Sequence, residues 1–263
     1  MNAALTKARS LSPKYHDHAD FLVKNYWIKY FKLGNEMFAN NMFTQAADYY
    51  TLSTQIDSSA AEGLQRYGDA LFKIARYKEA GKVYSSALKI TPDNVTIKNN
   101  LAEIYFIRKQ YQESIRYCNE ILSNNENDYG TLIRRAYAHD ALGNFKEAEA
   151  DFFMAALVKP SSRLLSDFGL VYFKNNDYRK AIFRFEEALE FPDSTTFIYR
   201  HLGEANWRIR DYRGMVKWYQ KIVATQPGDL VGWKNLAVAY EALGQTNNLA
   251  EARFHITKLT STN

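Results

Sequence analysis

The residue types that most often perform catalysis are few in this chain of 263 residues and stand far apart. Five histidines are scattered along it, and its single cysteine, Cys118, falls in a segment with core-type spacing. No HExxH, paired CxxC, GxSxG, P-loop or GxGxxG motif occurs. His16 and His18 lie two residues apart, a spacing that does not share one helix face and so does not predict a metal site. We expect neither an enzyme nor a bound cofactor or metal ion.

The residues that could do chemistry by binding are aromatic and recur at a fixed interval. At steps of 34 residues, or 67 where one step is doubled, stand Phe38, Phe72, Phe106, Phe173 and Trp207. Asp140 occupies the gap and Glu241 continues the series. Such a row could receive the apolar side chains of an extended peptide. The alternative is that these rings are partly buried against the next unit of the same period.

Polar residues accompany the aromatic row at the same interval. The cations are Lys32, Arg66, Arg134, Arg200 and Lys234, with His201 beside them, and the amides are Asn35, Asn99, Asn100 and Asn235. Acidic residues dilute the positive charge at Asp69, Glu103, Asp140, Asp167 and Glu204. We therefore predict a mixed surface with a basic bias, suited to a peptide that carries apolar and acidic residues.

The elements that must position these residues follow from small residues at the same interval. These are Gly34, Gly68, Ala102, Ala136, Gly169, Gly203 and Ala237, and twelve residues after most of them stands another small residue, as at Ala46, Ala80 and Ala148. Two small residues facing each other let two helices approach to about 8–10 Å. A large residue sixteen positions after the first, such as Tyr50 or Tyr84, fills the gap beside them.

Prolines and polar residues mark the ends of these helices. Pro92, Pro160 and Pro227 cannot continue a helix, and Asp93, Ser161 and Asp229 after them can cap the next one. The pattern resembles the tetratricopeptide repeat, a helix–turn–helix unit of this length, over about residues 27–259. The resemblance implies an all-α fold, a right-handed superhelical solenoid of antiparallel helix pairs without cofactors.

Seven repeats are expected, starting near residues 27, 61, 95, 129, 162, 196 and 230 and forming one continuous domain over 27–263. Residues 1–26 would hold a half-repeat, from Ala3 to Pro13, and an extension that makes the first helix run from about His18 to Asn40. With each repeat numbered from its first residue, the small residues take position 8. The aromatic row takes position 12, and positions 2, 5, 9 and 12 share one side of the first helix, which the resemblance places on the concave face.

Some family members hold the carboxylates of chaperone C-termini with a set of Lys, Asn and Arg residues. The corresponding residues of repeats two to four are Gln65, Asp69, Asn100, Gly130 and Arg134. Two of these five match that set, so we do not predict the chaperone clamp. Asn100 and Arg134 remain candidates for peptide contacts.

The two ends of the chain depart from the regular pattern. Residues 245–248 look like an insertion of about three residues in repeat seven, and no polar capping helix follows its second helix. A half-repeat before the array and an uncapped end suggest a segment of a longer protein, or an end that a partner covers. Self-association through Phe254, Ile256 and Leu259 is a further expectation.

Composition leaves the compartment open. The net charge is +5 with an isoelectric point near 9.0, and no apolar run approaches the roughly 20 residues that span a bilayer. One cysteine and no visible signal peptide favour the cytoplasm, with the periplasm as alternative. Membrane contact is considered only for the first helix, which has an aromatic side and a lysine side.

The function predicted from these residues is a non-enzymatic scaffold that binds a partner's extended segment in its concave groove and assembles a larger complex. The alternative is an RNA-binding helical repeat, favoured by the basic charge and by aromatic rings that could stack on bases. The acidic residues of the groove argue against it, since each would lie near phosphates. Nucleic acid is therefore the less favoured partner.

Overall fold

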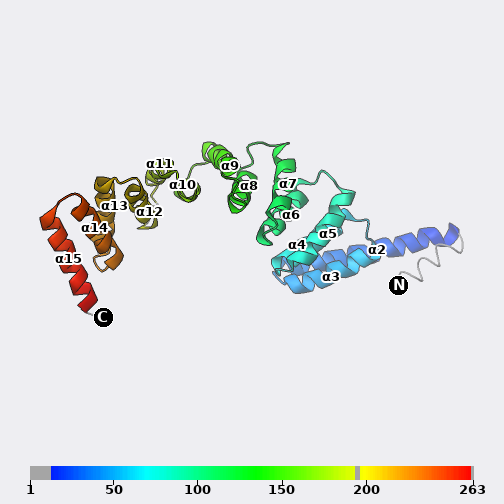
Figure 1. The fold of residues 1–263 in the computed structure, drawn as a ribbon. Coiled ribbons are helices and arrows are strands. Elements are labelled where there is room, and N and C mark those ends of the chain that lie inside the picture. The colour runs from blue at the N-terminus through cyan, green and yellow to red at the C-terminus, as the bar shows by residue number, and fades with distance from the viewer. Residues whose placement is uncertain (1–12, 193–195, 262–263) are drawn as a thin grey trace. The chain divides into compact units, whose positions relative to one another are not determined.

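The computed structural model describes residues 13–192 and 196–261, and their side chains from Asp20 onward. Every regular element in this part of the chain is a helix, as Figure 1 shows, and the all-α solenoid prediction is confirmed. No helix within it is long and apolar enough to cross a bilayer. The expected half-repeat, residues 3–13, lies almost wholly outside the described residues.

The chain divides into two compact units, one up to Arg134 and the other from Arg135, so that the boundary falls within one helix, α8. Each unit is described by itself below. The single continuous domain expected from the sequence therefore stays a prediction.

The first unit contains three helix pairs. They are α2 (Pro13–Ala39) with α3 (Phe43–Ile56), α4 (Ala61–Lys73) with α5 (Tyr77–Ile90), and α6 (Val95–Ile107) with α7 (Tyr111–Leu122), followed by the start of α8 (Tyr129–Ala141). Helix α2 is longer than the other first helices, as expected, and begins five residues before the predicted start. On it Trp27 stacks on buried Phe31 at 4.7 Å, while Phe21 and Tyr26 are exposed.

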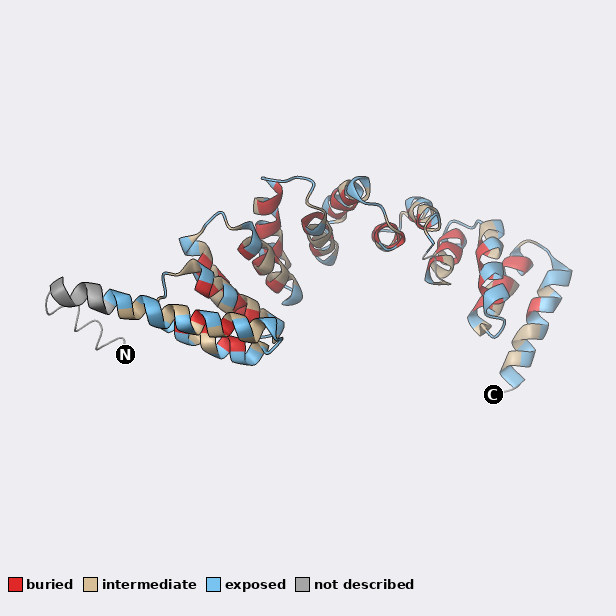
Figure 2. Ribbon diagram, turned by 180° about the vertical axis from the view of Figure 1, so that it is seen from behind, coloured by how far each residue is buried: buried red, intermediate tan, exposed pale blue. Residues whose placement is uncertain are grey.

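The second unit continues with the rest of α8 and seven further helices. They are α9 (Phe145–Val158), α10 (Ser162–Lys174), α11 (Tyr178–Ala188), α12 (Thr196–Arg208), α13 (Tyr212–Thr225), α14 (Leu230–Ala242) and α15 (Thr246–Ser261). In both units the buried residues, red in Figure 2, lie where consecutive helices of a unit face one another. The core of each unit is thus a series of interfaces between neighbouring helices.

The predicted packing of small against aromatic residues is present within the helix pairs. A Cβ atom on Gly68 would lie 2.6 Å from Cε1 of Tyr84, which is far inside van der Waals contact. The same relation joins Gly34 to Tyr50 and Gly203 to Tyr219. Only a residue without a side chain lets the ring lie this close to the first helix.

The turn inside each repeat has one geometry that the sequence did not reveal. Position 15 adopts a positive φ in every repeat, at Asn41, Ala75, Lys109, Gly143, Asn176, Arg210 and Gly244. The next residue then donates its N–H to a carbonyl five residues back, as Arg76 does to Leu71 at 2.9 Å. These bonds satisfy carbonyls left open at the end of the first helix.

One local prediction is corrected. The cap of α6 is Asn94, whose side chain accepts from the N–H of Ile97, and not Asp93, whereas Ser161 and Asp229 cap α10 and α14 as expected. In repeat seven the buried small residue, Ala252, comes three residues after the position that Ala46, Ala80 and Ala148 occupy in their repeats, as the predicted insertion requires. Helix α15 begins at the same repeat position as the other second helices, so the extra residues lie in its first turn.

Candidate functional site

The four phenylalanines of the aromatic row lie at the ends of first helices and are half-buried. Each ring packs edge-to-face on the first residue of the following helix: Phe38 on Phe43, Phe72 on Tyr77, Phe106 on Tyr111 and Phe173 on Tyr178, with ring centroids 5.1–5.5 Å apart. Each ring thus has a contact within its own repeat, and Phe173 also packs edge-to-face on His201 of the next repeat, with centroids 5.8 Å apart. Trp207 differs because it is 42% exposed, with the guanidinium of Arg208 above its ring. It is the most accessible ring of the row.

Asp140, which interrupts the row, is tied to the next first helix. Its Oδ2 lies 2.5 Å from Nζ of Lys174, the residue after Phe173. Its Oδ1 is buried and has no hydrogen-bond partner among the described residues. The carboxylate thus links α8 to α10 at a position where five other repeats carry an aromatic ring.

We call the side of the first helices that carries positions 2, 5, 6, 9 and 12 the inner side. In the first unit the polar residues on this side form hydrogen bonds with one another. The hydroxyl of Tyr84 donates to Oδ1 of Asp69 at 2.6 Å, and Nδ2 of Asn100 donates to the same oxygen at 3.2 Å. Burial raises the pKa of the Asp69 carboxyl, although the hydrogen bond from Tyr84 opposes this. In the preceding repeat, Tyr50 donates to Asn35 at 2.7 Å, and burial raises the pKa of Tyr50 to about 12.

The two inner arginines of this unit also have acidic partners. Nη2 of Arg134 lies 3.5 Å from Glu103, and its Nη1 lies 3.4 Å from the side-chain oxygen of Asn99. Arg66 is 3.9 Å from Asp69. Lys32, by contrast, is exposed. The inner side is therefore a mixed surface on which most candidate residues already have intramolecular partners.

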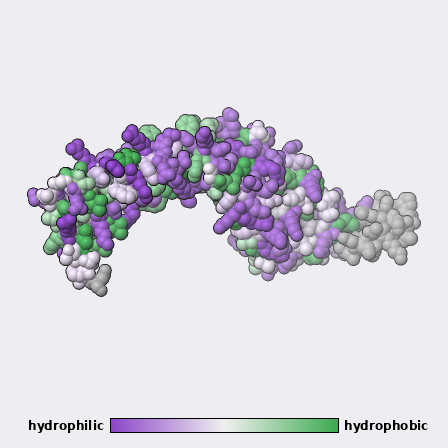
Figure 3. Space-filling view, in the orientation of Figure 1, coloured by the Kyte–Doolittle hydropathy of each residue, from purple (hydrophilic) through white to green (hydrophobic). Residues whose placement is uncertain are grey.

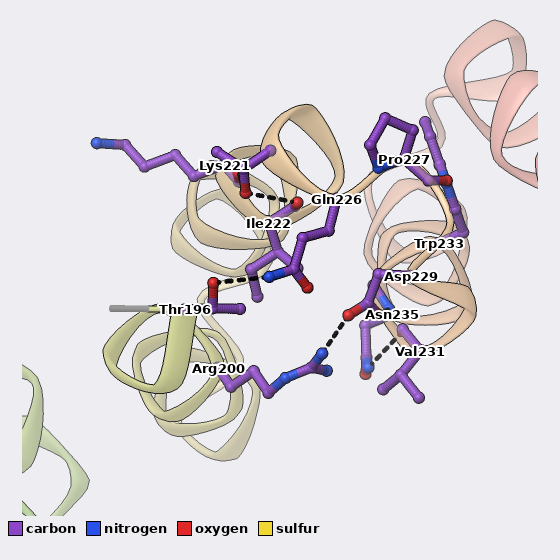
Figure 4. A network of polar contacts seen from close by, with 12 residues as sticks. Thr196, Arg200, Lys221, Ile222, Gln226, Pro227, Asp229, Val231, Trp233 and Asn235 are labelled. Carbon is purple, nitrogen blue, oxygen red and sulfur yellow. Dashed lines mark hydrogen bonds and ion pairs between the residues drawn. The ribbon is translucent and has the colours of Figure 1, made fainter. Parts of the chain in front are cut away.

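In the second unit the inner candidates gather where α12 and α14 begin. Figure 4 shows Arg200 of α12 reaching the carboxylate of Asp229, whose other oxygen caps α14 through the N–H of Gly232 at 2.6 Å. Beside this pair Gln226 donates to Thr196 at 3.2 Å. These contacts hold the two helix starts side by side, and the neighbouring Lys234 is exposed.

Apolar side chains surround this polar link, and we call them the inner apolar patch: Phe197, Trp207, Val231 and Val238, which are 42–54% exposed. They occupy positions 2, 9 and 12, the same side of the first helices as Arg200 and Lys234. Phe197 rests on the ring of His201 at 4.2 Å. The amide of Asn235, in contrast, is directed to the carbonyl of Val231 at 2.9 Å.

Three members of the patch, Phe197, Val231 and Val238, were missed by the sequence analysis. The signal that could have found them is their spacing, because positions 2 and 9 had already been assigned to the inner side. Figure 3 shows hydrophobic surface over the last helices of the second unit.

Over the described part of the chain, His139 and Cys118 do not belong to a cluster of residues that could perform catalysis. His139 is half-buried, its pKa is lowered because burial disfavours the charged ring, and Asn144 lies 3.4 Å from its Nδ1. Cys118 is buried. Within the described ranges no three His, Cys, Asp or Glu residues come together as a metal site would require.

Comparison with known families decides what this arrangement is. A model described as TPR repeat matches residues 68–107, and a second, described as tetratricopeptide repeat, matches residues 95–128. The chain is a tetratricopeptide repeat protein. Both matches fall in the first unit, and the TPR helix pairs described above extend the pattern through the second.

Similar proteins share limited identity with this TPR chain. Stress-induced-phosphoprotein 1 of Caenorhabditis elegans is 24% identical over 71% of this chain and 58% of its own length. The human FK506-binding protein-like is 27% identical over 46% of this chain and 37% of its own. Hsp70-Hsp90 organizing protein 1 of Arabidopsis thaliana is 22% identical over 67% and 32%. The matched region therefore spans less than two thirds of each of these relatives.

Solved TPR structures share the fold. MamA from Desulfovibrio magneticus RS-1 superposes with a TM-score of 0.61 at 16% identity, covering 65% of this chain and 97% of that one. YrrB, whose structure is described as a TPR protein with an unusual peptide-binding site, has a TM-score of 0.61 at 21% identity, covering 75% and 96%.

Proposed function

We propose that this TPR chain is a non-enzymatic scaffold that binds an extended segment of a partner protein on the inner side of its first helices. The observation that carries the proposal is the inner apolar patch, with four large apolar side chains left exposed on that side. Buried aromatic and aliphatic anchors supply most of the free energy at protein interfaces. The ligand would therefore carry apolar anchors, and its acidic residues would meet Lys234 of the same unit.

The names of the relatives agree with this role without identifying the partner. An organizing protein for two chaperones and a TPR protein with a peptide-binding site are both named for what they bring together or bind. The chaperone clamp is not carried over. Asn100 is bonded to Asp69, and Arg134 to Glu103, and the other positions of that set carry different residues.

RNA remains the less favoured ligand. Arg66, Arg134 and Arg200 each have a carboxylate within ion-pair distance, so phosphates would meet acids on the same surface. Only one ring of the aromatic row, Trp207, is exposed enough to stack on a base.

The test is a selection of binding peptides from a random displayed library with the purified chain, followed by titration of one selected peptide. Trp207→Ala should weaken binding by about tenfold or more at low and high salt, since a hot-spot aromatic supplies ~2 kcal/mol. Lys234→Ala should cost at most about fivefold, and only at low salt, since exposed ion pairs contribute ~0–1 kcal/mol and are screened.

The matched control is Phe183→Ala, because this ring is 56% exposed on α11, a second helix, away from the inner side. It should leave the affinity unchanged. Selected peptides that lose affinity with Phe183→Ala and keep it with Trp207→Ala would place the ligand on the second helices and refute the proposed site.

A further inference from the structure

The outer side of the second helices, opposite the inner side, carries grooves at equivalent repeat positions in the two units. In the first unit a groove of about 470 Å³ lies between α5 and the end of α6. In the second unit a groove of about 440 Å³ lies between α11, α12 and α13. Both are lined by positions 18, 21 and 25 of one repeat and by positions 11 and 14 of the next. A third groove, of about 530 Å³, lies on α13 at the same second-helix positions, and two of its cations already have partners: Lys217 pairs with Glu186, and Lys221 lies over the ring of Trp218 at 5.3 Å. The repeat architecture therefore builds this hollow more than once, and the two grooves that also take in positions 11 and 14 of the next repeat are the most alike.

The two grooves differ in charge. The groove in the first unit is lined by Lys78, Lys82, Lys89 and Arg108 and by no carboxylate. The groove in the second unit mixes both signs, with Glu186 and Asp211 beside Arg179 and Lys217. There Lys217 lies 3.4 Å from Glu186, so this groove is neutralised from within.

In the part of the chain that the structure describes, the cations of the first groove have no ion-pair partner, although Glu79 is near enough to interact electrostatically with Lys82. Among the residues that the structure describes, none of the four has a carboxylate within 4.0 Å, although nearby Arg76 pairs with Glu79 and Arg116 pairs with Glu113 at 3.0 Å. Lys78 and Lys82 are four residues apart on one helix, a spacing at which like charges repel. Four unpaired cations around one hollow are therefore an arrangement that an anionic ligand would stabilise.

One residue that lines the groove of the first unit has no side chain. Position 21 is Gly81 here, while the other repeats of the array carry Ile115, Ile182, Val216 and other larger residues there. The floor beside it is Tyr105, whose ring stacks on Tyr117 at 5.7 Å. The hollow is thus open to a ligand and bounded by a rigid aromatic wall.

We propose that this outer groove binds an acidic segment of a partner protein. The lysines are spread over eleven residues of α5, about 16 Å along the helix, which an extended chain of about five residues spans. That spread suits several carboxylates in a row better than one phosphate group. An RNA strand fits less well, because Tyr105 is the one aromatic ring among the described residues that line this groove and one of its faces is occupied by Tyr117. The site is independent of the inner side and of the ligand proposed there.

The experiment measures the fluorescence anisotropy of labelled hexaglutamate with the full chain at low salt. The double variant Lys78→Gln, Lys82→Gln should raise Kd by about tenfold, the loss expected for two charge-assisted contacts. Lys146→Gln is the matched control, an exposed lysine at position 18 of another repeat, and should leave Kd unchanged.

Circular dichroism of each variant separates loss of binding from loss of fold. The proposal is overturned if the folded double variant keeps the original Kd, or if Lys146→Gln costs as much affinity as the double variant. It is also overturned if labelled hexauridylate binds the groove more tightly than hexaglutamate does.

Discussion

Arg135 donates two hydrogen bonds to the carboxylate of Asp151, from Nε at 2.8 Å and from Nη2 at 2.6 Å. Asp151 is 4% exposed and belongs to the second helix of its repeat, whereas Arg135 belongs to the first. The pair therefore joins the two helices of one repeat inside a region from which water is largely excluded. This bidentate geometry is the strongest form of a hydrogen-bonded ion pair between arginine and a carboxylate.

Replacing Asp151 by Ala should lower the melting temperature clearly, because breaking a buried pair leaves one charge uncompensated and costs about 3–5 kcal/mol. Arg135 is partly exposed, so we expect the lower end of that range. Thermal unfolding followed by circular dichroism measures the effect. The control is Glu79→Ala, which breaks the exposed pair with Arg76 and should change the melting temperature little, because water screens such pairs. Equal effects of the two substitutions would contradict the assigned burial.

Gly68→Leu should destabilise the first unit by about 1–3 kcal/mol, since even a Cβ there would collide with the ring of Tyr84. Gly228→Ala is the matched control, because nothing lies within 4 Å of a Cβ at that site. Urea unfolding of both variants gives the comparison. An unchanged midpoint for Gly68→Leu would mean that α4 and α5 do not pack as described.

Ala75→Gly should raise stability, in contrast to most glycine substitutions in a helical protein. Ala75 has φ near +59°, a region that costs a residue with a Cβ about 1–2 kcal/mol. The greater freedom of glycine in the unfolded chain offsets part of this gain, so we expect a net increase of about 0.5–1 kcal/mol. Gly143→Ala, at the equivalent position of another repeat, should lower stability by a similar amount, and both shifts are measurable by chemical unfolding.

Helix α15 should exchange its amide hydrogens faster than α13 in a dilute solution of the chain. Ala252 is the buried residue described in α15, and Phe254 is 64% exposed, whereas α13 buries Met215 and Ile222. Local opening is easiest where few apolar contacts must break. Hydrogen exchange with mass spectrometry resolves the two helices. Uniformly slow exchange through α15 would contradict this prediction, and protection that rises with protein concentration would indicate self-association.

The helix pairs could be predicted from the sequence because their contacts join residues a short distance apart. Gly68 and Tyr84 are sixteen residues apart, and the same pair of types recurs in other repeats. The turn at position 15 could not be predicted, because residue types such as Ala75 and Lys109 do not indicate a positive φ. Its regularity comes from the hydrogen bonds that close the first helix.

The sequence predicted which repeat positions lie on the inner side. It did not predict which of these residues form hydrogen bonds with one another. The bond from Asn100 to Asp69 spans 31 residues and depends on how two repeats stack. The exposure of Val231 was missed because an apolar residue on a helix is usually assigned to the core. Which side of a helix the next repeat covers is decided by tertiary packing.

The ion pairs of the inner arginines have a consequence for ligand choice. Asp229 already forms an ion pair with Arg200. An incoming carboxylate must therefore compete with the Asp229 carboxylate, which has a high effective concentration because it belongs to the same chain. A ligand that offers only negative charge gains little from that exchange. The acidic partners of the inner arginines thus select against ligands that bind by charge alone. They favour a segment whose apolar side chains bind at the same time as its carboxylates.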